Sequence, residues 1–172
     1  MPHIFLSLGS NIEPKRQYIE SAIQLLGAEF PKEFQTSGIY KTHAYGNKDQ
    51  SYFLNACVSF YSNDTPFKML EKIRVLEQQL GRKRVYEKWA PRKIDIDILL
   101  FGKQTIQHPD LIIPHYELFE RDFFLVPLSD LDIGVVEEFT GKSIEGQLHK
   151  IPPNKRTNPV RISSSLLSAE NE

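Results

Sequence analysis

The chain has 172 residues, of which 40% are hydrophobic and 25% are charged, and its formal net charge is −1. This length fits one domain that buries its own core, and the near-neutral charge argues against a binder of long nucleic acid. No run of about 18 uncharged apolar residues is present, so no membrane span is expected. The single Cys57 rules out an intrachain disulfide and fits a reducing compartment, so we expect a cytoplasmic protein.

Hydrophobic periodicity predicts strands and helices in turn through the first part of the chain. Gly9-Ser10-Asn11 is expected to form a turn after the first strand, and Pro14 suits a first helical turn, where its missing N–H is not needed. In chain order we expect a strand at 4–8, a helix opened by Pro14 and ended by Gly27, strands at 34–40 and 52–61, a helix opened by Pro66 and ended by Gly81, and a strand at 94–101.

The second part of the chain has a looser pattern, which prolines divide into short segments, with a helical stretch expected near 116–125. Residues 1–150 are expected to form a single catalytic domain. Residues 151–172, rich in Pro, Ser, Asn and Lys, are expected to form a frayed C-terminal extension. The order βαββαβ predicts an α+β, ferredoxin-like core: a mainly antiparallel sheet with helices packed on it, followed by short C-terminal helices.

Two aspartates in an apolar strand provide the strongest chemical signal. Side chains alternate between the faces of a strand, so Asp95 and Asp97 project together while Ile94, Ile96 and Ile98 point into the core. Two neighbouring carboxylates repel each other, which calls for a cation. Mg²⁺ suits the pair because it prefers oxygen ligands and is commonly held by one or two carboxylates together with substrate phosphates.

A basic loop leads into this strand. Six of the twelve residues from Arg82 to Lys93 are Arg or Lys, a composition that suits phosphate oxygens. The only tryptophan, Trp89, lies in the loop, where it either packs on the core or closes over a flat aromatic ligand. Glycine-rich phosphate-binding motifs are absent from the sequence, and its five histidines lack zinc-ligand spacing. Carboxylates and arginines are therefore expected to hold any nucleotide.

Several spaced motifs resemble the hydroxymethyl-dihydropterin pyrophosphokinases of folate biosynthesis. The similarity covers roughly residues 4–131, and its strongest part is the Trp-Ala-Pro-Arg-Lys-Ile-Asp-Ile-Asp sequence at 89–97. The other matching segments are Leu8-Gly9-Ser10-Asn11, Glu77 with Gly81-Arg82-Lys83-Arg84, Pro114-His115-Tyr116, Arg121-Asp122-Phe123 and Pro127-Leu128.

The resemblance implies transfer of an intact pyrophosphate from the co-substrate ATP to the hydroxymethyl group of 6-hydroxymethyl-7,8-dihydropterin, with release of AMP. Asp95 and Asp97 would hold two Mg²⁺ ions and would form the catalytic set with Arg82 and Arg92. The residues implied for the nucleotide are Glu77, Arg84, Lys88, Trp89, Ile98, His115, Tyr116 and Arg121. Those implied for the pterin are Thr42, His43, Tyr45, Phe53, Asn55, Trp89, Asp95 and Phe123.

Two alternatives belong to other functional classes. A two-metal nucleotidyltransferase would use the same carboxylates but release pyrophosphate instead of AMP. A ferredoxin-like RNA-binding module would use the basic loop, but the chain lacks an RNP-like run, and paired aspartates repel a phosphate backbone. The expected partners are therefore small-molecule substrates, without nucleic acid or membrane, and the expected state is a monomer.

Overall fold

One antiparallel sheet organises the protein. The structure is a computed structural model, and it describes residues 1–43, 51–81, 92–131 and 134–163. The strands of this sheet are β1 (His3–Ser10), β2 (Gln35–Thr36), β3 (Ile39–Thr42), β4 (Phe53–Tyr61), β5 (Asp95–Phe101) and β8 (Val160–Ser163). Their order is β5-β1-β4-β3-β8, with β2 also paired to β4, so β1 is an interior strand between β4 and β5.

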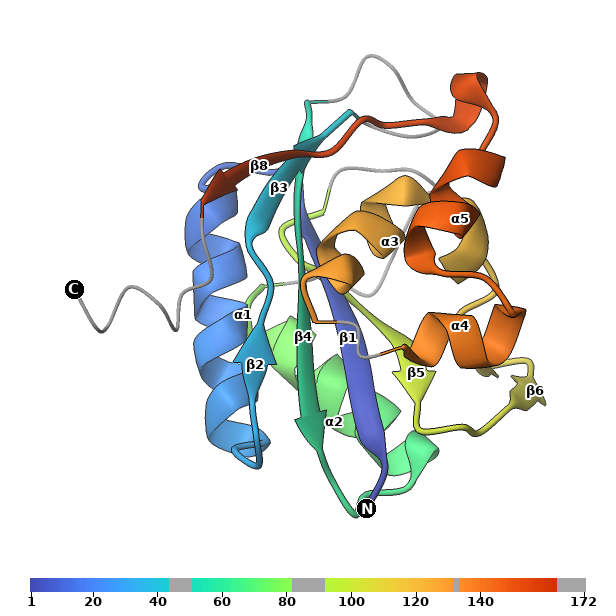
Figure 1. Ribbon diagram of the computed structural model, residues 1–172. Coiled ribbons are helices and arrows are strands. Elements are labelled where there is room, and N and C mark those ends of the chain that lie inside the picture. The colour runs from blue at the N-terminus through green and yellow to red at the C-terminus, as the bar shows by residue number, and fades with distance from the viewer. Residues whose placement is uncertain (44–50, 82–91, 132–133, 164–172) are drawn as a thin grey trace.

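Helices cover both faces of the sheet (Figure 1). The remaining elements are α1 (Lys15–Glu29), α2 (Pro66–Gln79), the hairpin β6 (Ile106–His108) and β7 (Leu111–Ile113), α3 (Asp122–Ser129), α4 (Val135–Thr140), α5 (Ile144–Lys150), and the 3₁₀ turns η1 (Leu118–Glu120) and η2 (Pro153–Lys155). Helices α1 and α2 pack on one face, and α3, α4 and α5 pack on the other. None of the helices in the described ranges is long and apolar enough to cross a membrane. The predicted ferredoxin-like βαββαβ core and the short C-terminal helices are confirmed.

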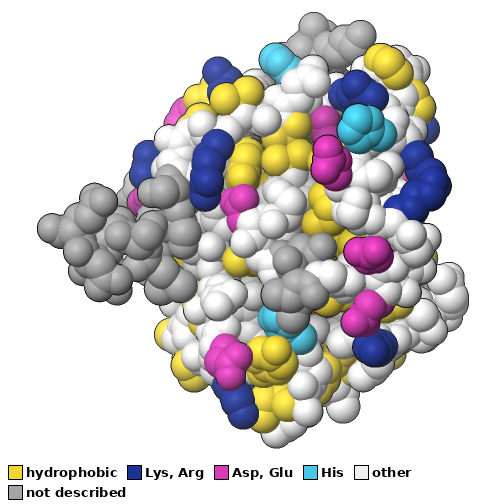
Figure 2. All heavy atoms as spheres, viewed as in Figure 1, with side chains coloured by type: hydrophobic (Ala, Val, Ile, Leu, Met, Phe, Trp, Pro, Cys, Tyr) yellow, Lys and Arg dark blue, Asp and Glu magenta, His cyan; other side chains and the backbone are white. Residues whose placement is uncertain are grey.

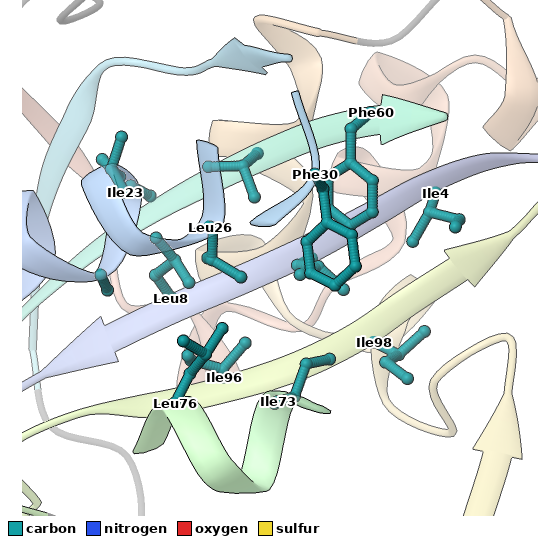
Figure 3. Close-up of a cluster of buried hydrophobic side chains, with 14 of the residues drawn as sticks. Ile4, Leu8, Ile23, Leu26, Phe30, Phe60, Ile73, Leu76, Ile96 and Ile98 are labelled. Carbon is teal, nitrogen blue, oxygen red and sulfur yellow. The ribbon is translucent and has the colours of Figure 1, made fainter. Parts of the chain in front are cut away.

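The larger core lies between the sheet and helices α1 and α2. Ile4 and Leu8 of β1 belong to the same buried cluster as Leu26 of α1, and the rings of Phe30 and Phe60 stack at 4.4 Å (Figure 3). Full burial of such a side chain contributes about 1.5–3 kcal/mol. This packing determines which side chains of β1, β4 and β5 face away from α1 and α2.

A smaller core forms on the opposite face, beneath α3, α4 and α5. A register shift between Phe5 and Leu6 of β1 makes the pairing with β5 irregular, and both Leu99 and Leu100 belong to this second core. Cys57 is buried in it, and this burial raises the pKa of its thiol. The second core stops short of the end of the sheet where β5 begins, and a cavity opens there.

Three local predictions around the first strand and the first helix differ from the structure. Gly9 and Ser10 continue β1 instead of forming a turn, since Gly9 pairs with Asn55 on one side and Asp95 on the other. Pro14 is the N-cap of α1, not its first helical residue, and the helix continues past Gly27 to Glu29. A Cβ at Gly27 would lie 3.2 Å from the ring of Phe34, so this glycine allows close packing.

The predicted strand at 34–40 is divided in two. Between β2 and β3, Ser37 accepts a hydrogen bond from the N–H of Cys57 at 2.8 Å, and Gly38 donates its N–H to Asp130 at 2.9 Å. The Ser37 N–H also donates to the Cys57 carbonyl at 2.8 Å, so the chain stays bonded to β4 at the break while Gly38 turns to Asp130. By contrast, α2 begins as predicted, with Pro66 at its first position and the Thr65 hydroxyl accepting the N–H of Lys68.

The C-terminal segment is paired rather than frayed up to Ser163. Strand β8 pairs with β3, and Asp122 at the start of α3 accepts bonds from the Thr157 N–H at 2.8 Å, the Thr157 hydroxyl at 2.6 Å and the Asn158 N–H at 3.0 Å. Asp122 and the pairing with β3 thus attach residues 157–163 to the rest of the fold, where fraying was expected. Residues 164–172 lie outside the described part, and the domain boundary at residue 150 stays a prediction.

Asp122→Ala should destabilise the protein by about 3 kcal/mol, because buried donors that lose a charged acceptor keep their desolvation cost. Chemical denaturation measures this change in the free energy of unfolding. Asp122→Asn, which keeps one carbonyl acceptor, should lose less. Equal stability of the wild type and Asp122→Ala would show that this carboxylate does not hold the C-terminal segment.

Candidate active site

A cavity of about 310 Å³ opens on the face of the sheet opposite α1 and α2. It lies where β1, β3, β4 and β5 present polar side chains, and the segment after β7 and the start of α3 complete its wall. The residues that line it are Ser7, Gly9, Thr42, His43, Phe53, Asn55, Arg92, Asp95, Asp97, His115, Tyr116, Glu117, Phe123 and Phe124.

The two aspartates of β5 form one wall of this cavity. Their side chains are 26% and 35% exposed for Asp95 and Asp97, while Ile94, Ile96 and Ile98 are at most 5% exposed in the opposite core. This confirms the predicted alternation of the strand. Because these carboxylates are partly accessible and not buried in the core, a metal ion that also binds phosphate can replace the water around them.

Glu77 of α2 supports this strand from the core side. Its side chain is buried, and its carboxylate accepts the N–H of Ile96, the residue between the two aspartates, at 3.1 Å. The bond therefore helps to fix the register of β5 at the aspartates. Glu77 is not among the residues that line the cavity, and its nucleotide contact stays a prediction.

Arg92 is held where the chain enters β5. Its N–H donates to the side-chain oxygen of Asn11 at 2.7 Å, and its carbonyl accepts the N–H of Asn11 at 3.1 Å. Its guanidinium lies 3.1 Å from Asp95. Asn11, directly after β1, thus positions a cation beside the carboxylates, where the planar guanidinium can also bind phosphate oxygens.

His115 faces the second aspartate from across the cavity. Its Nδ1 accepts the N–H of Glu117 at 3.1 Å, which places the proton of the neutral ring on Nε2, and Nε2 lies 3.9 Å from Asp97. Burial of the ring lowers the pKa of His115, while the charges of Glu117 and Asp95 act in the opposite direction. Tyr116 stacks on this ring at 4.8 Å and is 67% exposed, so it offers an accessible aromatic face.

The end of the cavity beside β3 and β4, away from the aspartates, combines amide, hydroxyl and aromatic groups. Asn55 donates a 2.6 Å hydrogen bond to the hydroxyl of Thr42, and both residues are buried. Phe53 and Phe123 add ring surfaces. A Cβ at Gly9 would lie only 3.1 Å from the side-chain oxygen of Asn55, so the absence of a side chain at Gly9 makes room for this amide.

The structure therefore brings most of the predicted residues together in one cavity. The exceptions are Glu77, Ile98, whose side chain lies in the larger core, and Arg121, which is buried and forms an ion pair with Glu117. The remaining predicted residues lie outside the described part of the chain, and their roles stay predictions: Tyr45, Arg82, Arg84, Lys88 and Trp89.

Five residues at the site were not predicted to have a role there. Ser7, Gly9, Glu117 and Phe124 line the cavity, and Asn11 holds Arg92. Strand alternation in β1 could have placed Ser7 and Gly9 on the face of the aspartates. Gly9 and Asn11 also lie in a segment that matches the family, and Glu117 and Phe124 lie close in sequence to the predicted residues His115 and Phe123.

The arrangement suits a phosphorylated ligand beside a flat polar ring. Among residues that the structure describes, no group of three or more His, Cys, Asp or Glu side chains could hold a metal by itself. The two aspartates could still share metal ions with the oxygens of a bound phosphate chain.

On the face that carries α3, α4 and α5, described acidic, basic and hydrophobic side chains are interspersed, consistent with the balanced net charge (Figure 2).

Comparisons with solved structures support the fold. A crystal structure of HPPK-DHPS in complex with substrates matches with a TM-score of 0.64 and 16% sequence identity, covering 86% of this chain and 43% of that chain. A Plasmodium falciparum HPPK-DHPS matches with a TM-score of 0.56 and 18% identity, over 75% of this chain and 39% of that chain. The chain thus spans less than half the length of these structures.

Sequence comparisons identify relatives of similar length and one that is much longer. The 2-amino-4-hydroxy-6-hydroxymethyldihydropteridine pyrophosphokinase of Bacillus subtilis is 38% identical over 79% of this chain and 81% of its own length. The enzyme of the same name from Aquifex aeolicus is 37% identical, over 84% and 89%. The folic acid synthesis protein fol1 of Pneumocystis carinii is 36% identical over 86% of this chain but only 20% of its own length. The model of the 7,8-dihydro-6-hydroxymethylpterin-pyrophosphokinase family matches residues 5–133, and the chain belongs to that family.

Proposed function

We propose that this cavity binds ATP and 6-hydroxymethyl-7,8-dihydropterin side by side and that its residues carry out the family's reaction. That reaction is pyrophosphoryl transfer to hydroxymethyldihydropterin in folate biosynthesis, and it makes the chain a transferase of the diphosphokinase class. One observation supports the assignment to this cavity above all. Asp95 and Asp97 form a wall of it, next to the pocket formed by Asn55 and Thr42.

The pterin fits the polar and aromatic end of the cavity. A pterin edge carries both donors and acceptors, and the amide of Asn55 offers both kinds of group. The bond to Thr42 fixes the orientation of this amide before the ligand arrives, which lowers the ordering cost of binding. Phe53 and Phe123 would contact the flat ring, and His43 lies at the rim of the same pocket.

The phosphate chain fits the other end, beside β5. Asp95 and Asp97 would hold two Mg²⁺ ions there, and both carboxylates are accessible from the cavity. Magnesium bound there would neutralise phosphate charge and orient the triphosphate. Arg92 would contact phosphate oxygens, and His115 and Tyr116 would meet the nucleotide across the cavity.

The proposed reaction is an in-line displacement at the β-phosphorus of ATP. The hydroxymethyl oxygen of the pterin forms the new bond to the β-phosphorus, and the bond from that phosphorus to the oxygen bridging to the α-phosphate breaks. AMP leaves with that oxygen, and the hydroxyl proton passes to water, because carboxylates that coordinate Mg²⁺ are weak bases. The protein contributes mainly by positioning the two substrates and by neutralising charge with Arg92.

The proposal extends to the state and location of the protein. We propose a monomer that acts on small molecules in the cytoplasm, without a nucleic-acid or membrane partner. Its single cysteine, Cys57, is buried and free, which is compatible with a reducing compartment. The interspersed charges of the face shown in Figure 2 favour small ligands over a long polyanion.

Asp97→Ala should lower kcat by about a thousandfold or more, because a lost metal ligand removes charge stabilisation from the transition state. Steady-state kinetics measure this loss, and calorimetric titration should find pterin affinity within about threefold of the wild type, since that end is intact. The matched control is Glu71→Ala, a surface carboxylate on α2 that should leave both values unchanged. A pterin affinity that falls as far as kcat would contradict separate metal and pterin ends.

Asn55→Ala should impair pterin binding and leave nucleotide binding intact. Loss of the amide should weaken pterin binding by about 10- to 100-fold, because a buried polar recognition group is removed. Affinity for a non-hydrolysable ATP analogue with Mg²⁺ should stay the same. Ser59→Ala, a change at another buried residue of β4 that does not line the cavity, is the control for stability. Unchanged pterin affinity in Asn55→Ala would place the pterin elsewhere.

A further inference from the structure

Lys15, the first residue of α1, is a buried cation outside the cavity. It is 2% exposed, although lysine is rarely buried unless it is paired. Its ammonium group donates a 2.6 Å hydrogen bond to the hydroxyl of Ser51 and lies 3.1 Å from the carboxylate of Glu13. It also lies 3.4 Å from the centre of the Tyr52 ring. The ammonium group thus contacts three other side chains, and neither Lys15 nor any of these three residues lines the cavity.

The ring of Tyr52 interacts with a second cation. The ammonium group of Lys41, from β3, lies 4.3 Å from the centre of the same ring. Cation–π attraction is strongest where the ammonium group is withdrawn from water, and Lys15 meets that condition. The arrangement therefore joins the start of α1, the end of β3 and the segment that leads into β4.

The contacts of Lys15 and Lys41 with Tyr52 lie next to the proposed pterin end of the cavity, one residue away from it along both β3 and β4. Tyr52 directly precedes Phe53, the first residue of β4, and Lys41 directly precedes Thr42. The space available there is small, because the missing Cβ of Gly9 would lie 3.8 Å from the Phe53 ring and 3.1 Å from the Asn55 oxygen. A shift at the start of β4 would therefore change the shape of the pocket.

We propose that Lys15 is a positioning residue that sets the pterin end of the cavity by holding Ser51 and Tyr52. It touches no substrate, and its effect passes through Phe53 and the Asn55–Thr42 pair. This inference rests on the proposed placement of the pterin. It predicts that Lys15 controls pterin affinity and leaves the phosphate end, formed by β5, unaffected.

Lys15→Met tests the inference because it keeps the length of the side chain and removes its charge and donors. We expect KM for the pterin to rise about tenfold, with kcat within about twofold and affinity for the ATP analogue unchanged. Lys15→Arg should recover most of the pterin affinity, since it restores a cation and donors. Lys68→Met, the same substitution at an exposed lysine of α2, should change none of these values.

Amide hydrogen exchange at residues 53–55 provides a readout that needs no ligand, and it should be faster in Lys15→Met than in the wild type. Unchanged KM and unchanged exchange would overturn the inference, as would equal losses of pterin affinity, ATP-analogue affinity and kcat. If Lys15→Met does not fold, Tyr52→Leu should show the same selective rise in pterin KM, and an unchanged KM there would also overturn it. Absence of pterin binding in the wild type would instead refute the proposed function.

Discussion

The alternation of side chains along β5 is the constraint on which the rest of the site depends. Ile94, Ile96 and Ile98 fill the core beneath α1 and α2, so the two aspartates must face the other side. A slip of one residue would bury both carboxylates and expose the isoleucines, at a cost of several kcal/mol for each buried charge. The same packing that stabilises the fold therefore places the proposed metal ligands in the cavity.

Interior strand β1 connects the two ends of this cavity. Gly9 pairs with Asp95 of β5 on one side and with Asn55 of β4 on the other, so one backbone position adjoins both proposed substrates. Contacts from outside the cavity support each end separately. Glu77 and Asn11 hold the β5 end, and Lys15 holds the β4 end. The two ends are therefore supported by different residues outside the cavity.

Features that depend on local pattern could be predicted from the sequence. The capped start of α2, the alternation of β5 and the order of the ferredoxin-like elements follow from periodicity and from residues such as Thr65. The pairing of β8 with β3 could not be predicted, because it joins residues more than a hundred positions apart and follows a segment that Asp122 binds. The burial of Lys15 could not be predicted from the sequence either, because a charged residue at the start of a helix usually faces solvent.

The most direct test of the account is to identify the nucleotide product. The wild-type protein would be incubated with ATP, Mg²⁺ and 6-hydroxymethyl-7,8-dihydropterin, and the products would be separated by ion-exchange chromatography and weighed by mass spectrometry. We predict AMP in a one-to-one ratio with a pterin that has gained a pyrophosphate, because attack occurs at the β-phosphorus. Formation of ADP with a singly phosphorylated pterin, or of free pyrophosphate with an adenylylated pterin, would contradict the account.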